Sequence, residues 1–334
     1  MRLETWCEIP GSRPGPRRVV VLLHGIFSSH DTFDQMKDVL QRRLTEDSKN
    51  GGSWEIAYWD YDYNQDLKDT AREFDGELAR ATGDEDRVVL ICHSMGGLVA
   101  RAALLSGAVA RERVVRLILL GTPNHGALRT SQLALLSQLL ISSGSGLYGI
   151  FLRKKGIRQL TDVDRLLEPL VSEGTQRLGN IDYVTIPGTF FHEGRRAWEV
   201  GQWGDGGAWK LAFAALNVAS EIVEGLFPLW SVTMARPHDG IVEASSNNLI
   251  PAGPGRWCEK AAAINHAGRL GTCTYAHIEP RACDELTHVM IQRDQRVIAL
   301  VADLVVAGSL PGWYKSLPAT ALAELRVELP GLQT

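Results

Sequence analysis

Residues 87–101 read RVVLICHSMGGLVAR, an apolar run that ends at a histidine and a serine and continues through two glycines. The β-branched start predicts a buried parallel strand over residues 87–92, because such strands are apolar on both faces. The small and apolar residues that follow predict a helix over residues 97–105. Ser94 therefore stands on a tight turn between a strand and a helix, which is the geometry of a nucleophile elbow.

The turn around Ser94 limits the size of its neighbours, because the positions two before and two after the serine are crowded. Gly96 meets this limit, and Cys92 stands where a glycine is usual but is still a small residue. The N–H of Met95 is expected to point at a developing oxyanion. The alternative is a serine that caps a helix in a nucleotide-binding or structural turn, so the assignment depends on the catalytic partners of Ser94.

Strand and helix signals alternate on both sides of this segment. Apolar, β-branched runs predict strands at residues 19–23, 54–59, 114–120 and 182–187. Helical spacing of apolar residues predicts helices at residues 31–44, with Asp31 as a cap, 67–81 and 290–306. The alternation predicts an α/β fold with a mainly parallel central sheet flanked by helices, in which the chemistry sits at the carboxyl ends of the strands.

Two segments interrupt this rhythm, and we interpret them as helical cap or lid insertions. Residues 127–179 are rich in leucine, and residues 189–235 carry several tryptophans and glycines and end in a predicted apolar helix at 211–226. The α/β core is then expected to comprise residues 1–126, 180–188 and 236–310, with residues 311–334 as a tail that docks on it.

Residues 130–152 contain no charged side chain, and an uncharged run of this length can form a transmembrane helix. Serines and glycines at 142–146 interrupt the run, so we favour a cap helix over a membrane span. Its leucines would either line a groove for an acyl chain or pack the cap onto the core. Transient contact of this cap with a membrane or lipid interface is part of the same expectation.

Charge and composition narrow the choice of partner and compartment. The formal net charge of -4 argues against nucleic acid, whose phosphates require a clustered basic excess. The first eight residues include two glutamates where a secretory signal would be apolar, and five cysteines are too few for a disulfide framework. We therefore expect a cytoplasmic protein that acts on a small molecule and needs no cofactor.

A polar loop follows the predicted strand at 19–23. Residues 24–27 read His-Gly-Ile-Phe, and acyl transfer needs a second oxyanion donor from a loop at this place. The N–H of Ile26 is the candidate, because Gly25 permits a close backbone approach. His24 precedes the nucleophile and ends a strand, which favours a structural histidine over a catalytic base.

The acid of a triad is expected after the serine and before the histidine, because its carboxylate must orient the base. Asp239 follows a strand-like run and precedes Gly240, so it lies on a tight turn. An ordinary Asp-Gly turn is the structural alternative. Two further carboxylates are weaker candidates, Asp205 and Glu243.

The base is expected among the histidines that follow Asp239. His288 is favoured, because it stands just before the predicted terminal helix, from which its ring can reach Ser94. The other candidates are His277, which ranks second, and His266.

A zinc site competes with this assignment. Cys273, His277, Cys283 and His288 lie within one short segment, and zinc accepts all four as ligands. Structural zinc sites usually begin with closely paired cysteines, which this segment lacks. We therefore expect no metal.

Three segments resemble the lipase and esterase branch of the α/β-hydrolases: residues 24–27, 93–101 and 121–126. They are especially similar to bacterial triacylglycerol lipases and to the hydrolase domain of GPI inositol-deacylases. Residues 239–242 and 286–289 resemble the segments that carry the acid and the base in those enzymes.

The resemblance covers residues 20–126 and 236–305 and implies the α/β-hydrolase fold with ester hydrolase chemistry. It implies a triad and two oxyanion donors at Ser94, Asp239, His288, Ile26 and Met95. The expected substrate is a carboxylic ester with an apolar acyl part, such as a lipid. A thioesterase or an acyltransferase would use the same residues, and a non-catalytic scaffold that binds a ligand or partner is the alternative from another class.

Overall fold

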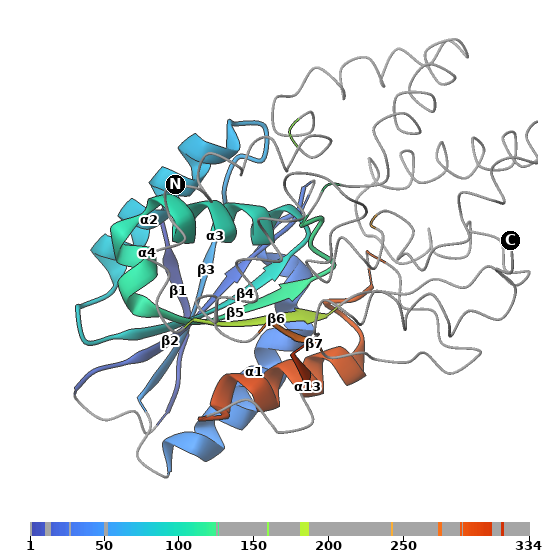
Figure 1. The fold of residues 1–334 in the computed structure, drawn as a ribbon. Coiled ribbons are helices and arrows are strands. Elements are labelled where there is room, and N and C mark those ends of the chain that lie inside the picture. Colours follow the sequence, from blue (N-terminus) through green and yellow to red (C-terminus); the bar gives the residue numbers. More distant parts are fainter. Residues whose placement is uncertain are drawn as a thin grey trace, which may run out of the picture.

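The computed structural model describes residues 2–10, 15–26, 28–49, 53–124, 126, 159, 181–186, 242, 273–275, 288, 290–308 and 315–316. The strands in this part of the chain form an eight-stranded sheet in the order β1-β3-β2-β4-β5-β6-β7-β8 (Figure 1). They are β1 (Glu4–Glu8), β2 (Arg18–Leu23), β3 (Trp54–Trp59), β4 (Arg87–His93), β5 (Val114–Leu120), β6 (Asp182–Ile186), β7 (Cys273–Tyr275) and β8 (Lys315–Ser316).

The six inner strands of this sheet pair in parallel, and the two outer strands pair antiparallel to their neighbours. This confirms the mainly parallel sheet and the predicted strands of the core. In the register, Leu23 of β2 lies beside both Trp59 of β3 and Cys92 of β4. The chain therefore leaves β2, β3 and β4 at the same edge of the sheet, where His24 and Ser94 follow.

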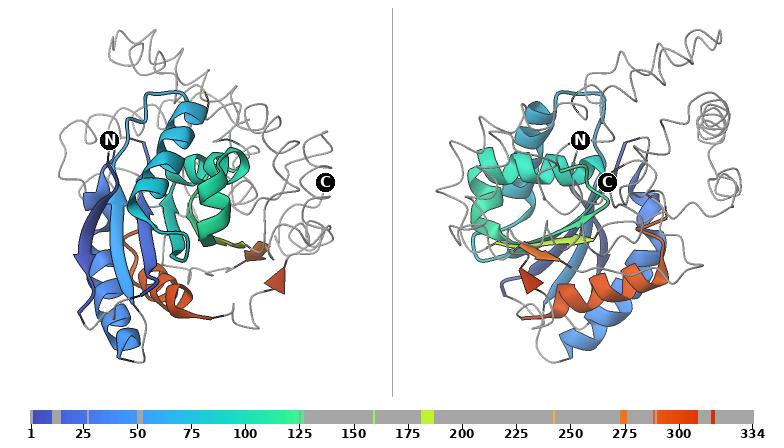
Figure 2. Two further views of the ribbon diagram at one scale, coloured as in Figure 1. Left: turned by 90° about the vertical axis from the view of Figure 1, so that its left-hand side faces the viewer. Right: turned by 45° about the vertical axis from the view of Figure 1, so that its right-hand side comes forward.

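Helices cover both faces of the sheet (Figures 1 and 2). On one face lie α1 (Asp34–Ser48) and α13 (Gln295–Val306), and on the other lie α2 (Leu67–Ala81), α3 (Met95–Ser106) and α4 (Ala108–Arg113). Residues of β2 alternate between the two apolar cores, with Val21 facing α2 and α3 and Val20 facing α1 and α13. Burial on both faces explains why the sequence of this strand is continuously apolar.

The predicted helix at 31–44 differs from the structure at both ends. A short 3-10 helix, η1 (His30–Phe33), comes first, and α1 then continues to Ser48. The expected cap at Asp31 is wrong: this residue lies inside η1, where its carboxylate accepts a hydrogen bond from the Ser29 hydroxyl at 3.1 Å. The residue at the N-cap of α1 is Phe33, whose side chain is buried in the core and provides no cap.

The predicted helix at 290–306 also begins later than expected. Residues 290–293 form a turn, and α13 starts at Gln295 with Asp294 as its cap. The Asp294 carboxylate accepts hydrogen bonds from the N–H groups of Arg296 and Val297. Because a capping side chain satisfies the first free N–H groups, Asp294 sets this boundary. His288 therefore lies before the helix, as expected, and is separated from it by the turn at 290–293.

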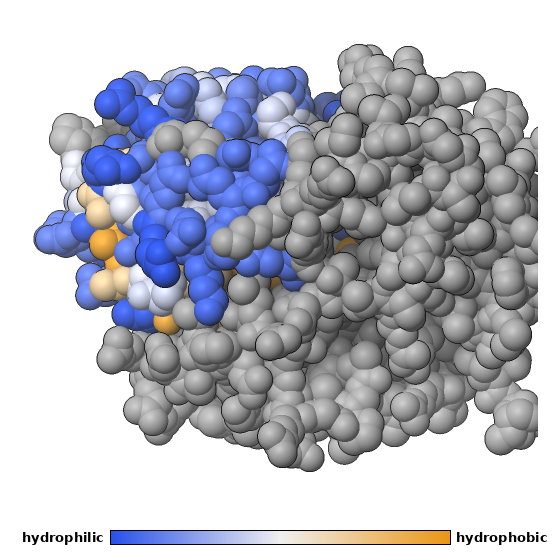
Figure 3. Space-filling view, turned by 90° about the horizontal axis from the view of Figure 1, so that it is seen from above, coloured by the Kyte–Doolittle hydropathy of each residue, from blue (hydrophilic) through white to orange (hydrophobic). Residues whose placement is uncertain are grey.

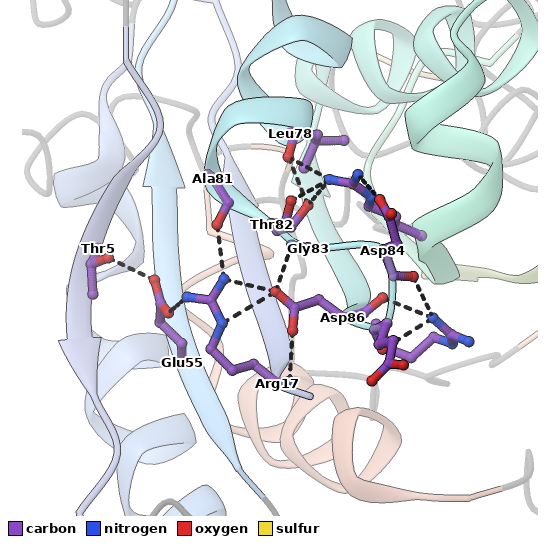
Figure 4. Close-up of polar contacts among 12 residues, drawn as sticks. Thr5, Arg17, Glu55, Leu78, Ala81, Thr82, Gly83, Asp84 and Asp86 are labelled. Atoms are coloured by element: carbon purple, nitrogen blue, oxygen red, sulfur yellow. Dashed lines mark hydrogen bonds and ion pairs between the residues drawn. The ribbon is translucent and has the colours of Figure 1, made fainter. Parts of the chain in front are cut away.

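At the edge of the sheet remote from Ser94, the start of β2 is fastened to the start of β4 by one ion pair (Figure 4). The Arg17 guanidinium lies 2.7 Å from Asp86 and 2.7 Å from Glu55 on β3. Asp86 is buried and also accepts hydrogen bonds from the N–H groups of Arg17 and Gly83. Burial alone would raise the pKa of Asp86, but these hydrogen bonds outweigh it and hold that pKa below its ordinary value.

Replacing Asp86 by alanine is expected to lower the free energy of unfolding by about 1–3 kcal/mol, because it leaves buried N–H groups without acceptors. Chemical denaturation at pH 7 measures this. The matched control is Asp84→Ala, in which an exposed carboxylate of the same loop loses its pair with Arg113, and stability should change little. Equal effects of the two variants would contradict the buried role of Asp86.

The lowered pKa of Asp86 also predicts how this contribution depends on pH. It is complete above the pKa of an unfolded aspartate, about 4, and is lost as the pH falls through the lower value of the folded state. The difference between the wild type and Asp86→Ala should therefore shrink below about pH 4.

Figure 3 shows the molecule from above relative to the view of Figure 1. On this face, the surface of the described residues is mainly hydrophilic. Helix α2 fits this, because its buried residues, among them Leu67, Phe74 and Leu78, repeat at helical spacing and leave the other side polar. Among the described residues, no helix has the length and apolar character needed to cross a membrane. The uncharged run at 130–152 lies outside the described residues.

Candidate active site

Ser94 occupies the sharp turn between β4 and α3. Its φ of 51° and ψ of -123° make it the one non-glycine residue with positive φ in the described part of the chain. Such a conformation costs free energy and persists only where the surroundings enforce it. Here the Ser94 N–H donates to the carbonyl of Leu120 on β5 at 2.9 Å, and the residue is 4% exposed. The backbone has the strained geometry of a nucleophile elbow.

The crowding expected around the turn is present. A Cβ on Gly96 would lie 2.6 Å from the carbonyl oxygens of His24 and Leu23, so only glycine fits there. Cys92, which stands where glycine is usual, is fully buried and packs in the core with residues of α3. Burial raises the pKa of the Cys92 thiol well above its ordinary value, so this group stays protonated and does not compete as a nucleophile.

His288 reaches Ser94 from the other end of the sequence. Its Nε2 lies 2.9 Å from the Ser94 Oγ, and its side chain is buried. When Nε2 is unprotonated, the serine hydroxyl donates to it, and the imidazole is placed to remove that proton. The structure thus brings together the serine and the histidine that were predicted from the sequence.

The main chain of His288 is held by a residue that the sequence analysis did not assign. The Nε2 of His93 lies 2.8 Å from the His288 carbonyl oxygen, and the two rings are 5.0 Å apart. Because a carbonyl only accepts, the Nε2 of His93 carries the proton and donates it. His93 immediately precedes Ser94, but no local pattern relates it to a residue 195 positions away.

The two predicted oxyanion donors belong to segments that meet at Ser94. Met95 is the first residue of α3, where helix N–H groups have no partner within the helix. Ile26 lies in the loop after β2, and this loop approaches the serine closely: a Cβ on Gly25 would be 2.9 Å from the Ser94 Cβ. The donor roles of these two N–H groups remain predictions.

His24 supports the loop that contains Ile26. Its Nδ1 lies 2.7 Å from the carbonyl of Gly25, and the hydroxyl of Tyr61 donates to the carbonyl of His24 at 2.8 Å. The Nε2 accepts from the Tyr61 N–H at 3.3 Å, so the proton resides on Nδ1. Burial lowers the pKa of His24, which favours the neutral ring and keeps its Nε2 free to accept from the Tyr61 N–H.

A second link between distant segments was also not expected from the sequence. The Gln292 side chain donates to the Thr32 hydroxyl at 2.8 Å, and both residues are buried. This hydrogen bond joins the turn after His288 to η1, which follows the Ile26 loop. The turn that follows His288 is therefore fastened to the segment that follows Ile26.

Several candidates from the sequence lie outside the described residues. These are Asp239 and its alternatives Asp205 and Glu243, the histidines His266 and His277, and Cys283. Asp239 therefore remains a prediction as the acid of the triad. Within the part of the chain that is described, no group of three metal-binding side chains occurs, and His288 faces Ser94.

Comparison with known proteins bears on the fold of this chain. Residues 16–140 match the family model described as the PGAP1-like alpha/beta domain. The lipase BlEst2 of Bacillus licheniformis in its mature form has a similar structure, with a TM-score of 0.54 and 15% identity over 91% of this chain and 98% of that one. This chain has an α/β-hydrolase fold. A search among curated sequences gives no match.

The propeptide form of the same lipase gives a TM-score of 0.56 at 16% identity, over 92% of this chain and 54% of the other. In an α/β-hydrolase the nucleophile stands on the strained turn between a central strand and the following helix. Ser94 occupies this place in the present fold, after β4. The fold and the PGAP1-like match agree with the resemblance to the lipase and esterase branch.

Proposed function

We propose that this protein is a serine hydrolase that cleaves a carboxylic ester with an apolar acyl part. The observation that carries the proposal is the 2.9 Å contact between the Ser94 Oγ and the His288 Nε2 at the strained turn. A serine hydroxyl is a weak nucleophile until an adjacent base takes its proton, and this contact provides the base. A scaffold that only binds a ligand would have no use for such an arrangement.

The reaction divides into acylation and deacylation. His288 takes the Ser94 proton as the Oγ attacks the ester carbonyl, and the resulting oxyanion rests on the N–H groups of Ile26 and Met95. The imidazolium then protonates the departing alcohol, which leaves an acyl group on Ser94. A water molecule loses a proton to His288, attacks the acyl carbonyl and releases the acid. Asp239 would hold the Nδ1–H of His288 throughout.

The same steps would cleave a thioester, or would pass the acyl group to an alcohol in place of water. No contact among the described residues favours either, so ester hydrolysis is the primary proposal. The apolar acyl part is inferred from the leucine-rich sequence of residues 127–179, as is a contact of that segment with a lipid interface.

A series of p-nitrophenyl esters from acetate to longer acyl chains tests this function. We expect hydrolysis whose kcat/KM rises with chain length, by up to about fourfold per buried methylene, because each contributes ~0.8 kcal/mol. A preference for acetate would overturn the apolar acyl part alone. Folded protein that cleaves none of these esters would overturn the hydrolase.

A further inference from the structure

The ring of His93 lies between the two loops that complete the candidate active site. We propose that His93 is a positioning residue, which holds the base His288 and the loop at Gly25 in place around Ser94. The proposal rests on the serine hydrolase function above and adds a residue to it. The base is assigned to His288 and not to His93, because the Nε2 of His288 contacts the Ser94 Oγ, whereas the Nε2 of His93 donates to the carbonyl of His288.

The first support is the hydrogen bond to the base residue. The His93 Nε2 donates at 2.8 Å to the main-chain carbonyl of the residue whose own Nε2 contacts Ser94. His93 and His288 are 6% exposed, so water competes little for this hydrogen bond. It fixes the backbone from which the catalytic ring extends and therefore limits how far that ring can move from the serine.

The second support is the contact of the same ring with the oxyanion loop. A Cβ on Gly25 would lie 3.1 Å from the His93 Nδ1 and 3.5 Å from its Cε1. The His93 ring therefore packs directly against the glycine whose approach to Ser94 brings the Ile26 loop to the nucleophile. One side chain touches both the base segment and the oxyanion segment.

The third support is the place of His93 in the sheet. It is the last residue of β4 and pairs with Leu120 of β5, whose carbonyl also accepts the Ser94 N–H at 2.9 Å. The nucleophile and the residue that holds the base thus share one fixed strand end. Because a displacement of about 1 Å at a reacting group can cost on the order of 100-fold in rate, this arrangement matters for turnover.

The test compares two substitutions that differ in the donor. His93→Phe keeps a ring but cannot donate, and His93→Gln places an amide N–H near the position of the lost Nε2. We expect His93→Phe to lower kcat by roughly 10- to 100-fold with KM within about twofold. His93→Gln should recover most of the loss. A fluorophosphonate should still label Ser94 in both variants, more slowly in His93→Phe.

The outcomes separate this proposal from the function on which it rests. Wild-type protein that neither hydrolyses esters nor reacts with the probe contradicts the hydrolase itself. An active wild type together with a fully active His93→Phe contradicts the positioning role, as does a His93→Gln variant as impaired as His93→Phe. If the phenylalanine variant does not fold, His93→Met also lacks a donor and takes its place in the same comparison.

Discussion

Ser94→Ala is expected to reduce kcat/KM for a p-nitrophenyl ester by roughly 10⁴- to 10⁶-fold, because it removes the atom that forms the acyl-enzyme. The residual rate would come from the oxyanion donors and substrate binding alone. The fold should survive, since alanine is close in size to serine and the turn is enforced by its surroundings. Those surroundings are the main-chain hydrogen bond to Leu120 and the close approach of Gly96 to β2.

The control for Ser94→Ala lies on the same helix. Ser106 ends α3, where its hydroxyl donates to the carbonyl of Ala102, remote from the nucleophile. Ser106→Ala should retain the wild-type kcat/KM. A folded Ser94→Ala variant with more than a few per cent of wild-type activity would remove Ser94 from the mechanism.

His288→Ala is expected to cause a loss of similar size, roughly 10⁴- to 10⁶-fold in kcat, because an unassisted serine hydroxyl is rarely ionised. Serine and histidine act as one unit, so the double variant Ser94→Ala/His288→Ala should be no slower than either single variant. Steady-state kinetics on the three variants measure this non-additivity. Additive losses would mean that the two residues act in separate steps.

The matched control for this histidine is His277, which the sequence offered as the second candidate for the base. His277→Ala should keep activity near that of the wild type. If His277→Ala were the more damaging substitution, the 2.9 Å contact of His288 with Ser94 would not be the catalytic one.

Elements with a strong local pattern were predictable from the sequence. Strands β3 and β5 and helix α2 have the predicted bounds, because each strand is a nearly continuous apolar run and the buried residues of α2 repeat at helical spacing. Helix boundaries set by single side chains were less accurate. Both Asp31 and Asp294 are plausible caps by type, and only tertiary packing decides that the second caps a helix and the first does not.

The two edge strands, β1 and β8, were not predicted, because their sequences lack a local strand pattern. β1 is mostly exposed and carries glutamates at both ends, so its sequence shows no alternation of apolar and polar residues. β8 has two residues and exists only through its pairing with β7. Their strand conformation comes from the neighbouring strand, which the local sequence does not describe.

Part of the candidate site was likewise predictable from the sequence, and part was not. Ser94 and Gly96 were found because the demands of the turn fall on adjacent residues, and chain order then pointed to His288. The contacts of His93 with His288 and of Gln292 with Thr32 join residues 195 and 260 positions apart. No spacing rule relates such pairs, so these contacts became visible only in the folded chain.

Labelling with a fluorophosphonate probe, followed by peptide mapping, tests the central claim that Ser94 is an activated nucleophile. The predicted result is a single adduct on Ser94, absent in Ser94→Ala and formed far more slowly in His288→Ala, with Ser106→Ala labelled like the wild type. Folded protein that carries no adduct, or carries it on another residue, would contradict the account.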